Sequence, residues 1–324
     1  MNNKITNLKI ITIKTCNWND SYWKSFTHNY NNIFNKNFTI DFFKDKYKSS
    51  SMGFSFHSLL INDLNEVVGA CTVMPYLYSR NSETLNLGQA VDVFIVEKYR
   101  SNPMILRDMY LELKEQLLLN EIICVLAVPN KNVFKYWTNV VKWKHIGNLN
   151  YWVHPIKIGS ALNTSKFLDK LSLLFSAFLG FLNCIFCKIL YDNKNHNTYK
   201  IIQNDEFLKM RFNNKYKKSD IGFFKIYKEK EVEVAYVFPT SNEPSLINLV
   251  KSIKIIREKT NAHLVFYVGT FNRFKYFLLR IPKKLEPQEL PLTCDILDKK
   301  NLLKYADMLE IKNWDFSLTN FDVR

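Results

Sequence analysis

The sequence predicts an α/β (α+β) fold of two domains, each with a mixed central sheet flanked by helices, and three observations support this. The chain has 324 residues, which is long for one core and suits two domains of about 150 residues each. Hydrophobic residues make up 47% and charged residues 23%, so both domains can bury a core. Strand-like and helix-like segments alternate in two blocks, separated by an apolar segment at 167–191.

The first block contains strands and helices of ordinary length. In chain order we expect a helix at 19–34, strands at 54–62 and 67–74 joined by a turn, a strand at 90–96, a helix at 103–120, a strand at 122–128, a helix at 133–141 and a strand at 149–158. The strand at 90–96 is apolar except for Asp92, which indicates a mostly buried strand. In the helix at 103–120, Ser101 or Asn102 can supply a capping oxygen and Pro103 suits the first position.

The second block has a similar order of elements. We expect strands at 222–228 and 232–238, a helix at 244–259 and a strand at 262–268. The predicted domains are therefore 1–158 and 193–324, joined by an apolar linker helix within 159–192.

The apolar segment at 167–191 has three interpretations. It is a buried helix between domains, a helix lying in a membrane interface, or a membrane span of marginal length. The net charge of +15 supports the second interpretation and makes peripheral membrane contact through 167–191 an expectation.

Charge and cysteine content restrict the partners and the compartment. A net charge of +15 attracts nucleotide phosphates, CoA, nucleic acid or an anionic membrane face. Nucleic acid is not the expected partner, because the aromatic residues recur at core spacing. The six scattered cysteines predict reduced thiols and a cytoplasmic protein, at the inner face of the membrane if 167–191 binds lipid. Cys184 and Cys187 have no second pair nearby, so no metal site is expected.

Several short segments of the first block occur in the order of one known family. They are the run from Asp92 to Arg100, the helix after it, the Val-Pro-Asn run that ends at Asn130, and the run from Lys142 to Gly147. Together with 67–70 upstream, they resemble the core of the GNAT-type N-acyltransferases over residues 39–158. The two-block layout, with short matches at 207–212 and 313–316 and at Asp322, resembles the tandem members that acylate nucleotide-linked amino sugars.

The resemblance implies an acyl-CoA site in the first block, with acyl-CoA as co-substrate and no metal. In such proteins two parallel strands part, and the exposed backbone of one strand pairs with the pantetheine. The following helix N-terminus holds the pyrophosphate. Carried over to this sequence, the implied CoA-binding residues are Phe94, Ile95, Val96, Arg100, Ser101, Asn102, Met104, Ile105, Leu106 and Asn130. Where the family has glycines this chain has Ser101-Asn102-Pro103, so the turn is rebuilt or CoA binding is weakened.

Three side chains are candidates for the chemistry. Asp92 could act as base or substrate anchor, against the alternative of an ion pair or a strand-end hydrogen bond. Tyr136 lies near the position of the family's thiolate-protonating tyrosine, with Trp137 one residue away as its competitor. His154 could face the site from the last strand, whereas His57 is expected to be a satisfied strand histidine.

The predicted function is the transfer of an acyl group from acyl-CoA to a small amine. The resemblance implies a nucleotide-linked amino sugar used in surface polysaccharide. Two alternatives stay open. One is a FemAB-type transferase that takes its aminoacyl group from tRNA, which the charge of +15 suits. The other is a non-catalytic, membrane-peripheral scaffold of the same fold.

Overall fold

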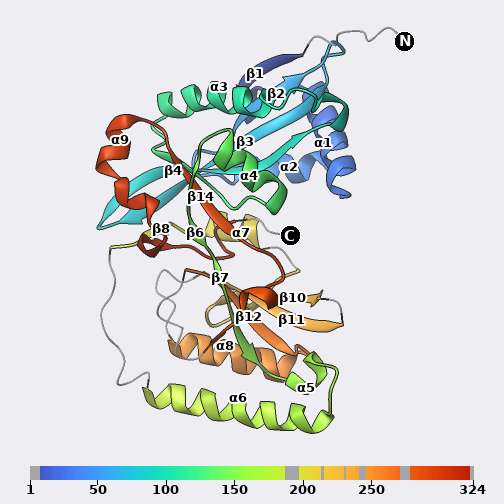
Figure 1. Ribbon diagram of the computed structural model, residues 1–324, viewed down its shortest axis with the longest axis vertical. Coiled ribbons are helices and arrows are strands. Elements are labelled where there is room, and N and C mark those ends of the chain that lie inside the picture. Colours follow the sequence, from blue (N-terminus) through green and yellow to red (C-terminus); the bar gives the residue numbers. More distant parts are fainter. Residues whose placement is uncertain are drawn as a thin grey trace. The chain divides into compact units, whose positions relative to one another are not determined.

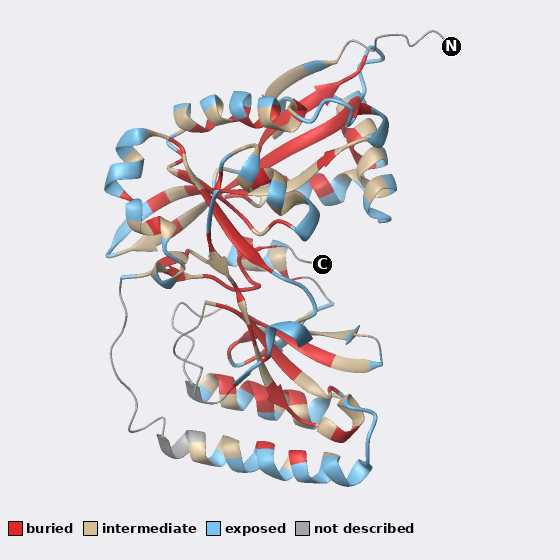
Figure 2. Ribbon diagram, in the orientation of Figure 1, coloured by how far each residue is buried: buried red, intermediate tan, exposed pale blue. Residues whose placement is uncertain are grey.

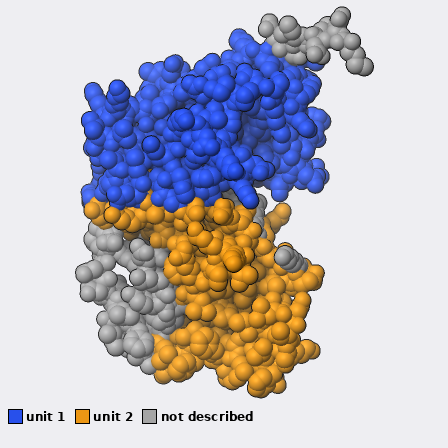
Figure 3. All heavy atoms as spheres, in the orientation of Figure 1, with its two compact units in different colours: residues 1–147, 291–310 blue, residues 148–290, 311–324 orange. Residues whose placement is uncertain are grey.

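The computed structural model describes residues 8–186, 197–212, 215–229, 231–240, 246–270 and 278–321. Cys187, Asp322 and the end of the apolar segment lie outside the described residues, as does the side chain of Cys184. The chain divides into two compact units, coloured separately in Figure 3. Unit 1 comprises 1–147 and 291–310, and unit 2 comprises 148–290 and 311–324.

Unit 1 contains one mixed sheet with helices on both faces (Figure 1). Its strands run in the order β1-β2-β3-β4-β5-β14-β6. The strands are β1 (Lys9–Lys14), β2 (Phe56–Ile61), β3 (Val67–Arg80), β4 (Glu83–Ile95), β5 (Cys124–Ala127), β6 (Lys144–Asn148) and β14 (Pro291–Ile296). The main helices are α1 (Asp20–Phe34), α2 (Ile40–Lys48), α3 (Ile105–Leu119), α4 (Lys131–Asn139) and α9 (Lys299–Lys304).

Two buried clusters occupy the two faces of this sheet. On one face, aromatic side chains of α1 and α2, among them Trp23, Phe26 and Phe43, pack with Phe94 of β4. On the other face, the apolar stripe of α3 that includes Met109 and Leu113 packs on β2 and β5. The predicted helical spacing on α3 is thus explained by burial of one helix face.

Local capping sets the helix starts. Asn19 and Thr39 accept hydrogen bonds from backbone N–H groups three residues later, and α1 and α2 begin directly after them. The start predicted at Pro103 for the helix at 103–120 is corrected: α3 begins at Ile105. Pro103 and Met104 form a turn, which Asn102 closes by accepting from Met104 N at 2.9 Å.

Unit 2 has the second mixed sheet, in the order β13-β7-β12-β11-β10-β9. The strands of this sheet are β7 (Asn150–Pro155), β9 (Lys217–Ser219), β10 (Gly222–Glu229), β11 (Val232–Pro239), β12 (Leu264–Gly269) and β13 (Leu279–Arg280). Two short strands, β8 (Tyr199–Ile201) and β15 (Trp314–Asp315), form a parallel pair outside this sheet. The helices of unit 2 are α5 (Ile158–Ala161), α6 (Lys166–Phe186), α7 (Asp205–Arg211) and α8 (Leu246–Lys259). Strands β11 and β12 are parallel, and α8 connects them in sequence. The prediction of two mixed sheets flanked by helices is confirmed.

The order of strands along the chain does not follow the division into two sheets. Strand β7 follows β6 after one residue, yet it pairs with β12 in the second sheet. Strand β14 comes from the far end of the chain, yet it pairs with β5 and neighbours β6 in the first sheet. These bounds differ from the predicted boundary at 158. Helix α6 packs on α8 and β7 and belongs to unit 2, where a separate linker was expected.

Candidate functional site

Strand β4 leaves its parallel neighbour halfway along its length. The described pairs between β4 and β5 are Gly88 with Val125 and Gln89 with Leu126, whereas β3 stays paired with β4 as far as Ile95. Val96 N donates to Val68 O at 2.8 Å, so the N–H and C=O of Ile95 point away from β3, toward the edge that β5 has left. The predicted parting of two parallel strands is therefore present.

A β-bulge lies within this open stretch. The register between β3 and β4 shifts between Ala70, which opposes Phe94, and Thr72, which opposes Val91. Asp92 lies in the bulge with a φ of +48°, in the left-handed region that aspartate tolerates better than most residues. Such conformations cost about 1–3 kcal/mol and persist only where neighbouring contacts hold them.

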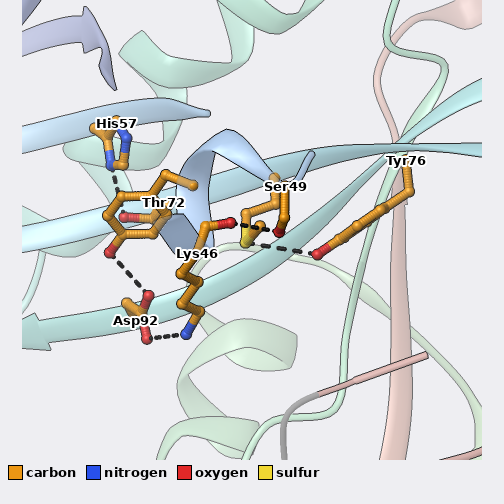
Figure 4. A network of polar contacts seen from close by, with 8 residues as sticks. Lys46, Ser49, His57, Thr72, Tyr76 and Asp92 are labelled. Carbon is orange, nitrogen blue, oxygen red and sulfur yellow. Dashed lines mark hydrogen bonds and ion pairs between the residues drawn. The ribbon is translucent and has the colours of Figure 1, made fainter. Parts of the chain in front are cut away.

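Two side chains of α2 hold the Asp92 carboxylate (Figure 4). Lys46 Nζ lies 2.9 Å from Oδ1, and the Tyr47 hydroxyl donates to Oδ2 at 2.8 Å. The Asp92 side chain is 4% exposed and that of Lys46 is 14% exposed, so the ion pair is largely buried. The ion-pair alternative for Asp92 is therefore present in the structure, and it does not exclude a role in binding an amine.

The polar contacts continue into the core beside Asp92. His57 is fully buried, with Nδ1 2.9 Å from Thr72 Oγ1 and Nε2 2.7 Å from Thr15 Oγ1. Burial lowers the pKa of His57 well below its ordinary value, so the ring is neutral. Burial, followed by the neighbouring charge of Asp92, raises the pKa of Tyr47, so its phenol stays protonated and donates.

The first turn of α3 is partly engaged by groups of its own unit. Met104 N binds Asn102 Oδ1, and Ile105 N binds Asn102 O at 3.3 Å. Arg107 N donates to the Tyr136 hydroxyl at 3.2 Å. Of the predicted pyrophosphate amides, Leu106 N–H is the one for which the described residues offer no acceptor.

Tyr136 and Arg100 both form hydrogen bonds with backbone groups of the predicted CoA site. The Tyr136 hydroxyl donates to Pro103 O while it accepts from Arg107, so it braces α4 against the start of α3. Burial raises the pKa of Tyr136, which keeps the phenol protonated. The exposed Arg100 turns back and donates from Nε to Ile95 O at 2.7 Å, on the open edge of β4.

The other predicted cofactor residues lie in the same unit. Phe94 points into the aromatic cluster, 5.4 Å between ring centroids from Phe26, so only its backbone remains for a ligand. Val96 is half-buried and Ser101 is exposed. Asn130 is the N-cap of α4 and accepts from Asn132 N and Val133 N, both at 3.1 Å. Phe94 and Asn130 thus have structural roles that a ligand contact would supplement.

His154 belongs to unit 2, unlike Asp92 and Tyr136. It is 2% exposed on β7, and its Nε2 lies 2.7 Å from Ser176 Oγ of α6. This is the environment of a buried histidine that joins a strand to the helix covering it. We leave His154 out of the proposed catalytic set.

The equivalent place in unit 2 is filled by the chain itself. Strands β11 and β12 pair at four positions, from Val234 to Val237. Beyond them Ser317 bridges to Gly269, and Thr319 Oγ1 donates to Pro239 O at 2.6 Å. The buried segment 316–321 thereby contacts the ends of both parallel strands. Of the parallel pairs β4–β5 and β11–β12, only β4–β5 leaves an open edge among the described residues.

Sequence reasoning missed Lys46, Tyr47 and Thr72, the residues that complete the Asp92 network. They come from α2 and β3, 46, 45 and 20 positions away from Asp92, and no local pattern connects them. The available signal was Asp92 itself, because a carboxylate in an apolar strand requires a cationic or hydrogen-bonding partner. The sequence offers 45 lysines and arginines, so it cannot say which one.

Three solved structures share this fold across most of the chain. A protein of Enterococcus faecalis V583, described as a probable N-acyltransferase, matches with a TM-score of 0.55 and 10% identity over 92% of this chain and 74% of its own. A GCN5-related N-acetyltransferase of Anabaena variabilis matches with a TM-score of 0.56 and 10% identity, over 90% of this chain and 74% of its own. A GCN5-related N-acetyltransferase of Kribbella flavida matches with a TM-score of 0.55 and 9% identity, over 91% of this chain and 72% of its own. At such identities the likeness shows the fold, which is the GNAT fold. No family model and no curated protein matches the chain.

Proposed function

We propose that unit 1 transfers an acyl group from acyl-CoA to a primary amine. The observation that carries the proposal is the parting of β4 from β5 after Gln89, with the backbone groups of Ile95 turned to the open edge. A pantetheine arm has amides that can pair with such an edge as a strand would. The pyrophosphate would then meet the start of α3, where Leu106 offers its N–H and the helix dipole favours an anion.

The fit of acyl-CoA to these residues is incomplete without small rearrangements. Arg100 must release Ile95 O, after which its guanidinium is available to a phosphate. Tyr136 must release Arg107 N to free a second amide of the first turn. Both residues are at least partly exposed, so these movements need no change in the core.

Asp92 is the proposed base or anchor for the amine. Its carboxylate already binds one primary ammonium group, that of Lys46, and a substrate amine would take the same place. The amine nitrogen attacks the thioester carbonyl, its proton passes to a base, and the C–S bond breaks as the thiolate leaves. Tyr136, held protonated, is the proposed donor to that thiolate. Positioning supplies most of the remaining rate in such reactions.

The acceptor class rests on the sequence resemblance alone. We propose a nucleotide-linked amino sugar, and the net charge of +15 is compatible with its phosphates. Nothing in the described side chains of unit 1 selects this sugar over another primary amine.

Thiol release from acetyl-CoA, measured across a panel of primary amines, tests the reaction, and calorimetry with CoA tests the site. We expect Asp92→Asn to lower kcat about a hundredfold with CoA affinity unchanged. Tyr136→Phe should lower kcat as well, while Tyr22→Phe, which removes only a hydroxyl that donates to Asn65 of an exposed turn, should change nothing. Absence of both CoA binding and thiol release would remove the proposal and leave a scaffold of this fold.

Aminoacyl-tRNA as donor is the second candidate, and the charge of +15 is the observation that favours it. It predicts tRNA binding that weakens steeply with salt, together with indifference to CoA. Acyl-CoA binding that persists at high salt would exclude it.

A further inference from the structure

Helix α6 is packed with its small and polar residues inward. Ser172 accepts from Ile158 N at 3.0 Å and donates to Ile156 O at 2.8 Å, and Ser176 contacts His154. Gly180 lies against α8, where an added Cβ would be 3.7 Å from a methyl group of Val250. The side of α6 that faces the rest of unit 2 thus carries these small residues together with Leu173, which packs on the core of that unit.

Seven large apolar side chains of α6 point to solvent instead. Figure 2 shows exposed positions along the side of α6 away from α8. Phe167, Leu174, Phe178 and Phe181 are 64%, 69%, 55% and 63% exposed. The exposed set as a whole is Phe167, Leu168, Leu171, Leu174, Phe175, Phe178 and Phe181. Five of its members recur at steps of four and three, which makes one continuous stripe about 21 Å long.

Basic residues border this stripe. Lys166 and Lys170 are exposed, and Lys170 lies about 40° around the helix from Leu174. The sequence of α6 contains one acid, Asp169, and it is turned inward, where it accepts from Ser160 N at 2.8 Å. The exposed sides of α6 are therefore apolar and cationic, on a chain with a net charge of +15.

We propose that α6 docks unit 2 on an anionic lipid surface, lying flat with the stripe of phenylalanines and leucines among the acyl chains. The charge selects this occupant, because lysines beside the stripe meet anionic headgroups while the apolar side chains leave water. A second copy of the chain would instead bring two molecules of charge +15 together. No helix among the described residues is long and apolar enough to cross a membrane.

Vesicle sedimentation with the full chain tests the proposal. We expect binding to vesicles of phosphatidylcholine with phosphatidylglycerol, and little binding to phosphatidylcholine alone. Phe175→Ser with Phe178→Ser should weaken partitioning about twentyfold, because each loses a half-exposed phenyl ring from the lipid contact. Both positions face solvent in the free protein, so the fold should persist, which circular dichroism checks.

Three further measurements test the role of the lysines, the insertion of the apolar side chains into lipid, and the restriction of binding to α6. Lys166→Glu with Lys170→Glu should reduce binding to the anionic vesicles. The tryptophan introduced by Phe178→Trp should shift its fluorescence emission to the blue when anionic vesicles are added, because its ring leaves water for the lipid. The matched control is Leu119→Ser with Leu303→Ser, two exposed leucines of unit 1, which should bind as the wild type does.

Two results would overturn the proposal. One is a wild-type chain that stays in the supernatant with anionic vesicles, or that binds them equally after Phe175→Ser with Phe178→Ser. The other is a dimer in light scattering that this double variant converts to a monomer while vesicles leave it unbound. In that case the stripe is covered by a second copy of the chain. Thiol release from acetyl-CoA is measured separately, so neither result bears on the acyltransferase proposal.

Discussion

Replacing Asp92 by Asn separates the charge of this residue from its backbone conformation. Asn and Asp have nearly the same size, and both tolerate the left-handed φ of +48° found in the bulge. The substitution therefore keeps the bulge and the contact with Tyr47, and it removes the negative charge opposite Lys46.

The cost follows from the burial of the pair. Removing one partner of a fully buried ion pair costs about 3–5 kcal/mol, because the other charge is left without compensation. Lys46 is 14% exposed and can reach water in part, so we expect the lower figure of about 2–3 kcal/mol for Asp92→Asn. Lys46→Met leaves the carboxylate with the Tyr47 hydrogen bond and should cost about as much. The double variant has no unpaired charge, so its loss of stability should be about 2 kcal/mol smaller than the sum of the losses of the two single variants.

Denaturant unfolding of the four proteins measures this coupling, and tryptophan fluorescence is a suitable signal because Trp18 lies 4.5 Å from the His57 ring of the same network. Strict additivity of the two substitutions would refute the account. Activity distinguishes the two roles of the carboxylate. If Asp92 serves only the ion pair, Lys46→Met and Asp92→Asn reduce thiol release alike, whereas a base or anchor is lost only in Asp92→Asn.

Three further predictions concern packing, pH and domain structure. Gly88→Ala should destabilise by about 1–3 kcal/mol, because its Cβ would lie 2.6 Å from a methyl of Val73; Val73→Ala should relieve part of this in a double-mutant cycle. The folded-state pKa of His57 is depressed, so the unfolded chain takes up a proton first, and stability should fall below about pH 6.5, by about 1.4 kcal/mol at pH 5.5. Thermal unfolding of His57→Gln should lack that loss. A fragment of residues 1–158 should not unfold cooperatively unless 291–310 is supplied, because β14 separates β5 from β6; a cooperative transition of the fragment alone would contradict this.

Much of the local structure could be predicted because it depends on near neighbours. The helix after Asn19, the paired strands β2 and β3 and the stripe on α3 follow from capping and periodicity, which act within a few residues. Strand β4 was predicted only from residue 90, although it begins at Glu83. Its first half alternates polar and apolar residues around Gly88, and that pattern is typical of many exposed turns as well.

The candidate site was predictable as a place and only partly as a set of contacts. The run from Asp92 to Arg100 located the open edge of β4. The partners of Asp92 come from α2, and the partner of Arg107 N is Tyr136 on α4. These contacts depend on how the helices pack on the sheet. The number of residues between two positions in the sequence does not show whether their side chains meet.

The sequence by itself determined the order of the elements between residues 54 and 141, the basic charge, the buried strands and the apolar character of α6. Only the tertiary structure decided that β7 pairs in the sheet of unit 2, that β14 returns from late in the chain to the sheet of unit 1, and that α6 turns its phenylalanines outward. The physical reason is that the hydrogen-bonding edge of one strand is chemically like that of any other. Which strand fills an edge, and which face of a helix is covered, is selected by the packing of side chains that are far apart in the chain.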